Sequence, residues 1–328
     1  MHPDPPTATA PNPYDLIPYE SQPITFTGPE HMAVSALLQG GPRPPVERFR
    51  YLEIGCADGG NLLPLAFHHP ESFFVGVDSS AAEVEAARMG AATIGIANVR
   101  FEVADVRALP DLGGPFDYIA VHGVYSWVPE DAREAILACC RERLTLDGLA
   151  YISYNVCPGW KVRGVVRDIA VTAAAGESDP RRRLALARMA AQRLVEVLPE
   201  DNSGAAPWPR LLRRELEKFL SSRAAYVVHE YLAEDNQPFY FHEFVAGAEA
   251  HGLAYVGDAD IGQRVNFRVF LYWFFCFFFD RFLFGHWLNG NFGLFFFRFL
   301  NFLGFLSFLR FLGFFGIDFF RFLFFGIR

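Results

Sequence analysis

A carboxylate precedes a turn of small residues in the segment YLEIGCADGGN, which spans residues 51–61. Glu53 lies two residues before Gly55, at the end of a short apolar run. Gly55, Ala57 and Gly59 have little or no side chain, so the backbone of this turn can approach a ligand closely. A helix after the turn would direct free N–H groups at a carboxylate, while Glu53 would meet an ammonium. The pattern predicts a site for the zwitterionic amino-acid part of a ligand.

Two ligands compete for this turn, S-adenosylmethionine and a dinucleotide. Gly55, Ala57 and Gly60 also fit a degenerate form of the dinucleotide motif G-x-A-x-x-G. A pyrophosphate bound there would be repelled by Glu53, whereas the methionine part of S-adenosylmethionine would not. We therefore favour S-adenosylmethionine as the cofactor, and a dehydrogenase stays the alternative.

Acids also end the next two predicted strands. Asp78 closes the apolar run of residues 72–78, where its carboxylate would accept hydrogen bonds from both ribose hydroxyls. Asp105 would accept from the adenine amino group, while the N–H of Val106 meets a ring nitrogen. Either acid alone could instead cap a helix or sit in a turn. Their positions on successive strand ends favour cofactor binding. The remaining candidate contacts in these loops are Cys56, Asn61 and Ser79.

A histidine followed by aromatic residues ends the fourth predicted strand. His122 is the candidate to orient or deprotonate a methyl acceptor. Tyr125 and Trp127 follow in the loop, where aromatic faces could line a methyl channel and favour a cation. The alternative for all three is packing, and the sequence singles out no general base.

Strands and helices alternate along residues 49–175. The apolar runs that predict strands lie near residues 51–53, 72–78, 98–106, 116–123 and 148–155. Helical segments of about a dozen residues separate them, an order typical of a parallel sheet covered on both faces. We predict a doubly wound, mostly parallel, Rossmann-like α/β sheet with a smaller, mainly helical C-terminal unit.

Five segments are similar to those of one protein family. They are NPYDLIPYESQPI (12–24), LEIGCADGGNLLPLA (52–66), VHGVYSWVPED (121–131), SYNVCPGWKVRGVVRDI (153–169) and the stretch at 229–260. On these segments the chain resembles bacterial class I S-adenosylmethionine-dependent methyltransferases that carry a methyltransferase regulatory domain. The resemblance implies cofactor contacts from the residues Glu53, Gly55, Gly59, Asp78, Asp105, His122 and Gly123. It also implies protein lysine as the acceptor, because some relatives methylate lysines of bacterial surface proteins.

Two other functions stay open. A small-molecule acceptor would be favoured if the N-terminal arm of residues 12–30 closed over a compact pocket. A non-catalytic cofactor-binding or regulatory protein is the other alternative, since no base is identified. A homo-oligomer also stays open.

Composition limits the partners and the compartment. The net charge is −8, and the seven Arg and two Asp from Gly262 onward leave the first 261 residues at −13. A body so acidic argues against a nucleic-acid substrate. The five cysteines include no C-x-x-C pair and the histidines form no metal motif, so we predict no metal and a reducing compartment. The N-terminus lacks the apolar core of a secretory signal, so we expect a cytoplasmic protein.

The chain divides by composition into five predicted parts. They are an N-terminal arm (1–48), the S-adenosylmethionine-binding domain (49–175), a helical connection and linker (176–209), a partial regulatory domain (210–261) and a Phe-rich tail (262–328).

The tail differs in composition from everything before it. It holds 25 of the 36 Phe, and from Phe299 it repeats in triplets, a period that matches neither helix nor strand. One hypothesis is a membrane-associating tail whose Arg side chains reach the interface, which would make the membrane a partner. The other, which we favour, is a non-native segment that replaces the rest of the regulatory region.

Overall fold

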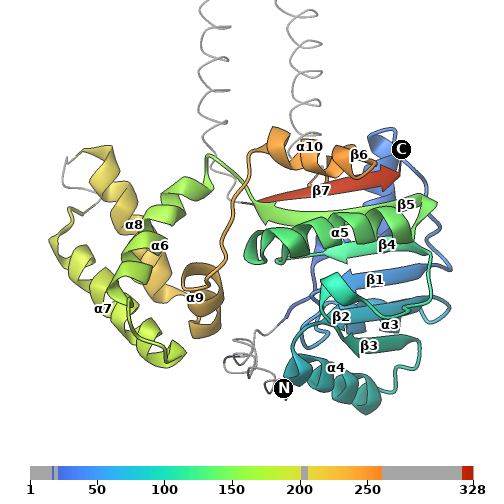
Figure 1. The fold of residues 1–328 in the computed structure, drawn as a ribbon, viewed down its shortest axis with the longest axis horizontal. Helices are drawn as coiled ribbons and strands as arrows, with labels where there is room; N and C mark the ends of the chain where they lie inside the picture. Colours follow the sequence, from blue (N-terminus) through green and yellow to red (C-terminus); the bar gives the residue numbers. More distant parts are fainter. Residues whose placement is uncertain (1–16, 18–20, 201–205, 261–319, 328) are drawn as a thin grey trace, which may run out of the picture.

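One seven-stranded sheet forms the body of the protein (Figure 1). The structure is a computed structural model that describes residue 17 and residues 21–200, 206–260 and 320–327. The strand order is β3-β2-β1-β4-β5-β7-β6, and the first five strands pair in parallel. The strands are β1 Arg50–Ile54, β2 Phe73–Asp78, β3 Val99–Val103, β4 Phe116–Val121, β5 Leu144–Asn155, β6 Leu253–Asp258 and β7 Phe320–Ile327. The predicted doubly wound, mostly parallel sheet is confirmed.

Helices cover both faces of this sheet. Side chains of α5 and α10 pack into the core on one face, and those of α2, α3 and α4 pack on the other. The helices are α2 Pro29–Leu38, α3 Leu62–His68, α4 Ala81–Ile94, α5 Glu130–Arg143, α6 Trp160–Ala173, α7 Pro180–Val197, α8 Pro207–Ser221, α9 Ala224–Tyr231 and α10 Phe241–Ala250, with short 3₁₀ turns η1 Thr25–Thr27, η2 Val106–Ala108 and η3 Tyr125–Trp127.

Local sequence sets where these elements begin and end. Helix α4 begins after Ser80, whose Oγ accepts from the N–H of Glu83 at 3.2 Å. It ends at Gly95, which adopts a left-handed φ of 74°. The preceding strand β2 is buried on both faces, so its sequence FFVGVD is a continuous apolar run that ends in Asp78.

A separate helical unit, made of α6 to α9, lies beside the sheet (Figure 1). Val166, Phe219 and Val227 belong to its own hydrophobic core. The predicted partial regulatory domain of residues 210–261 contributes to both parts, since α8 and α9 pack in this unit while α10 and β6 return to the sheet. The predicted domain boundaries stay predictions.

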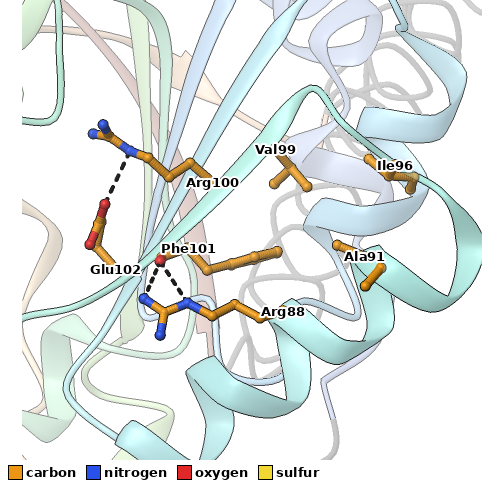
Figure 2. Close-up of a pocket in the computed structure, with 8 residues that line it drawn as sticks. Arg88, Ala91, Ile96, Val99, Arg100, Phe101 and Glu102 are labelled. Atoms are coloured by element: carbon orange, nitrogen blue, oxygen red, sulfur yellow. Dashed lines mark hydrogen bonds and ion pairs between the residues drawn. The ribbon is translucent and has the colours of Figure 1, made fainter.

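Charged side chains cover the outer edge of the sheet at β3 (Figure 2). Arg88 of α4 donates from Nε and Nη2 to the carbonyl oxygen of Phe101, at 3.2 and 2.7 Å. Arg100 and Glu102 form an ion pair with 3.2 Å between Nε and Oε1. Charges on an edge strand discourage pairing with another chain. We therefore interpret the charged side chains around this hollow as residues that keep the edge strand β3 from pairing with another chain, and not as a ligand site.

Strand β7 comes from the far end of the chain and lies between β5 and β6. It is antiparallel to both, and Leu323, Phe324 and Phe325 are fully buried. Here the structure differs from the sequence analysis, which saw no strand period in the tail. A strand buried on both faces needs no polar alternation, so a Phe-rich run fits this slot. Residues 261–319 lie outside the described residues. Among the described helices, none has the length and apolar character of a membrane span.

We expect Phe324→Ala to lower the free energy of unfolding by about 3–5 kcal/mol, because it deletes a fully buried ring. Urea denaturation of the full chain measures the change. Leu146→Ala is the matched control, since Leu146 is 77% exposed and its loss should cost no more than about 0.5 kcal/mol. Equal stability of the two variants would show that β7 does not belong to the sheet.

Candidate active site

The loop between β1 and α3 follows a backbone path that small residues allow. Gly55, Ala57 and Gly59 have φ values of 76°, 44° and 79°, in the left-handed region. A Cβ on Gly55 would lie 2.3 Å from Cγ2 of Val124, so the β4 loop packs directly on this backbone. Cys56, a predicted contact, is 2% exposed and packs its side chain in the core, where Sγ lies 3.7 Å from the carbonyl oxygen of Ala57.

Glu53, the residue before the last of β1, has a carboxyl group that is almost entirely out of water. Its side chain is 3% exposed, and Oε1 accepts from Nδ2 of Asn61 at 2.8 Å. Oε2 is buried and accepts no hydrogen bond within the described residues. Burial, with a smaller contribution from the nearby Asp78 charge, raises the pKa of Glu53 to about 8. A cation placed at Oε2 would reverse this penalty, so the orphaned oxygen fits the ammonium of an amino-acid ligand.

The N-terminal arm is hydrogen-bonded to the glycine loop. Ser21 Oγ donates to Oδ1 of Asp58 and accepts from the N–H of Gly60 at 2.7 Å. The N–H of Ile24 donates to Oδ1 of Asn61 at 2.9 Å. Asn61 therefore links the arm to the cofactor acid, a role that the sequence analysis did not assign to it.

Asp78 holds two loops together at the end of β2. Its Oδ2 accepts from the N–H of Ala57 at 3.0 Å, and its Oδ1 accepts from the N–H of Ser80 at 2.9 Å. The predicted ribose hydroxyls would share this carboxylate with the two backbone N–H groups. The neighbouring Ser79 is exposed at the same strand end.

Asp105 is engaged by an arginine that the sequence analysis did not consider. Arg107 donates from Nη2 to Oδ2 of Asp105 at 2.6 Å and from Nε to Oδ1 at 2.9 Å. Its Nη1 also donates to Oδ2 of Asp131 at 2.8 Å. These bonds lower the pKa of Asp105. An adenine amino group would therefore have to share a carboxylate oxygen of Asp105 with the guanidinium of Arg107. Val106, the other predicted adenine contact, is half-buried and begins η2 directly after Asp105.

His122 follows β4 and is bonded to strand β5. Its Nδ1 lies 2.9 Å from Oη of Tyr151, and the two rings stack with centroids 5.9 Å apart. Burial lowers the pKa of His122 to about 4, so the imidazole is neutral at physiological pH. The N–H of Gly123, next in the chain, donates to Oγ of Ser153 at 2.7 Å.

The two loop aromatics take different positions. Tyr125 is 5% exposed and packs edge-on against Phe244 of α10, with ring centroids 4.9 Å apart. Tyr125 therefore packs in the core, which is the alternative role that the sequence analysis gave it. Trp127 is half-buried and meets the edge of Trp160 of α6 at 5.6 Å. This contact joins the β4 loop to the helical unit.

Sequence reasoning missed Ser126 and Asn155, which are both buried where this loop meets the end of β5. The signal was available for Asn155, since it is a polar residue that closes an apolar strand in the same way as Glu53 and Asp78. No cluster of three or more metal-ligating side chains occurs in the described ranges, where the cysteines are free thiols.

Sequence profiles match two parts of the chain. A "Methyltransferase domain" matches residues 52–148, and a "Predicted methyltransferase regulatory domain" matches residues 223–268. The first contains the glycine loop and the three acids at the strand ends.

Three proteins of Rickettsia illustrate the wider similarity. The uncharacterized protein RP789 of Rickettsia prowazekii is 38% identical over 76% of this chain and 45% of its own length. The uncharacterized protein RP028 of the same organism is 33% identical over 72% of this chain and 93% of its own length. The solved structure of PKMT2 from Rickettsia typhi in complex with AdoHcy superposes with a TM-score of 0.67 at 32% identity, over 74% of this chain and 46% of that one. The chain thus spans about half the length of RP789 and of PKMT2.

We expect wild-type protein to release close to one proton when it binds S-adenosylhomocysteine at pH 7. With a pKa of about 8, Glu53 is mostly protonated at this pH, and an ammonium at Oε2 would ionise it. Below pH 8 the affinity should therefore fall as the pH drops. Glu53→Gln should bind more weakly and release no proton. Calorimetric titration in two buffers of different ionisation enthalpy counts the protons.

Glu102→Gln is the control, because Glu102 pairs with Arg100 at the sheet edge. It should match the wild type in affinity and in proton release. If Glu53→Gln released as many protons as the wild type, Oε2 would not be the ammonium site.

Proposed function

The chain belongs to the family of S-adenosylmethionine-dependent methyltransferases that carry a methyltransferase regulatory domain, and from this we propose that it methylates lysine side chains of proteins. The observation that carries the choice of acceptor is the 32% identity over 74% of the chain to PKMT2, a protein-lysine methyltransferase.

The cofactor would lie across the carboxyl ends of β1, β2 and β3, where open α/β sheets bind ligands. In this proposal Glu53 Oε2 meets the ammonium, the glycine loop faces the methionine part, and Asp78 holds the ribose. Val106 and Asp105 would hold the adenine, with Asp105 shared with Arg107.

The acceptor would approach from the ends of β4 and β5. S-adenosylmethionine supplies a methyl group on a positively charged sulfur; the amine nitrogen forms the new N–C bond while the electrons of the C–S bond stay on sulfur. The amine must first lose a proton to solvent, because an ammonium has no lone pair. His122, with a pKa of about 4, is too weak a base to remove it, so we assign His122 to orientation.

A small-molecule acceptor is the second candidate, and the arm supports it. Ser21 and Ile24 hold the arm onto the loop of residues 58–61, beside the predicted methionine site. Such a cover would narrow the opening to a compact pocket. The nature of the methylated product separates the two candidates.

Incubation of the full chain with methyl-labelled S-adenosylmethionine and heat-unfolded total bacterial protein tests the proposal. After acid hydrolysis we expect the label in methylated lysine, with Glu53→Gln showing a much lower rate. Label in compounds that pass a dialysis membrane would favour the small-molecule acceptor. Bound cofactor with no transfer to either fraction would identify a non-catalytic binding protein and overturn the proposal.

The pH dependence of the rate tests the neutral role of His122. At saturating cofactor, kcat/KM for the protein acceptor should rise about tenfold per pH unit from pH 6.5 to 9, because the lysine amine, with an ordinary pKa near 10, must deprotonate. His122→Gln should keep this slope while it lowers the rate. A plateau that begins near pH 7 in the wild type and disappears in His122→Gln would identify His122 as a titrating base.

A further inference from the structure

Asn155 is the last residue of β5, and its side-chain amide is buried without hydrogen-bond partners among the described residues. The residue is 1% exposed, and neither Nδ2 nor Oδ1 makes a hydrogen bond within the described residues. Burying an amide without partners costs free energy, so such a group calls for an explanation. A half-buried asparagine just before β3 shows the ordinary solution: Nδ2 of Asn98 donates to the carbonyl oxygens of Ala66, His69 and Ser72, at 3.0–3.1 Å.

The backbone around Asn155 is fixed by three segments. Its N–H donates to Oγ of Ser126 at 2.9 Å, and its carbonyl oxygen accepts from the N–H of Phe239 at 2.9 Å. The N–H of Gln237 donates to the carbonyl oxygen of Ser126 at 2.8 Å. The β4 loop, the end of β5 and the segment before α10 therefore hold this residue in one place.

The face of β5 that carries Asn155 also carries the groups bonded to the end of β4. Tyr151, Ser153 and Asn155 alternate along the strand and share one face. Tyr151 Oη bonds to His122, and Ser153 Oγ accepts from Gly123. Asn155, the third residue of this row, is the one whose side-chain polar atoms make no hydrogen bond within the described residues. It lies at the carboxyl end of the sheet, beside the proposed approach of the methyl acceptor.

We infer that Oδ1 of Asn155 accepts a hydrogen bond from the acceptor amine and holds its lone pair toward the methyl group; this rests on the proposed lysine methylation. An amide suits this task better than a carboxylate. A carboxylate would stabilise the ammonium form of lysine, which cannot attack, whereas a neutral oxygen accepts an N–H without that penalty. The acceptor amine thus donates to an oxygen of Asn155 that has no hydrogen-bond partner in the free protein.

Two substitutions in the full chain test this role. Asn155→Leu removes the buried polar atoms at similar volume, so the melting temperature should stay or rise while methyl-lysine formation falls about 10²-fold. Asn155→Asp keeps the shape and adds a carboxyl group beside the bound amine, so the rise of kcat with pH at saturating acceptor, which reports groups in the enzyme–acceptor complex, should shift upward by about one unit or more. Both should bind S-adenosylhomocysteine like the wild type. Asn98→Leu is the matched control, which should lower the melting temperature because it breaks three bonds.

Heat-unfolded total bacterial protein is the acceptor in every assay, with methyl-lysine as the readout. Asn155→Leu with activity within threefold of the wild type would overturn the inference. A second result would also overturn it: the melting temperature of Asn155→Leu falls as much as that of Asn98→Leu, and the pH profile of Asn155→Asp is not shifted. The amide of Asn155 would then have a structural role only. If the wild type binds cofactor but forms no methyl-lysine, the proposed function itself fails. Wild-type activity with unaffected Asn155 variants removes only the inference.

Discussion

The arrangement of the site depends on one carboxylate kept out of water. Glu53 stands at the end of β1, the central strand of the parallel part of the sheet, with one oxygen bonded to Asn61 and the other left for a cation. Asn61 in turn bonds to the N-terminal arm through Ile24. The glycine loop must stay tight to place Asn61 there, and Val124 packs where a side chain on Gly55 would be. A single buried carboxyl group is therefore connected to the loop, the arm and the β4 connection.

The parts of the site that follow from strand ends could be predicted from the sequence. Glu53, Asp78 and His122 each close an apolar run, and parallel strands bring such residues to one edge. Contacts between distant segments could not be predicted in this way. The bond of Arg107 to Asp105 and Asp131, and the packing of Tyr125 on Phe244, need the tertiary arrangement. The unused amide of Asn155 is visible only once every neighbouring donor and acceptor has been placed. Strand β7 escaped prediction because doubly buried strands lack a period.

The regulatory part is joined to the proposed acceptor side by backbone hydrogen bonds. Gln237 and Phe239 lie in the stretch that matches the regulatory-domain profile, and they bond to Ser126 and Asn155. On the other side, Trp160 of α6 meets Trp127 and donates from Nε1 to Oδ1 of Asn236 at 3.0 Å. Residues 236–239 therefore join the helical unit to the end of β5.

The insertion of β7 between β5 and β6 has a consequence for how the protein is made. During translation β5 and β6 are synthesised before residues 320–327. The edges of both strands that later pair with β7 therefore have no partner while residues 259–319 are synthesised. Exposed, apolar strand edges are templates for pairing between chains. The time needed to synthesise that stretch therefore sets a window in which nascent chains are open to aggregation, and synonymous codons that change its translation speed should change the yield of folded enzyme.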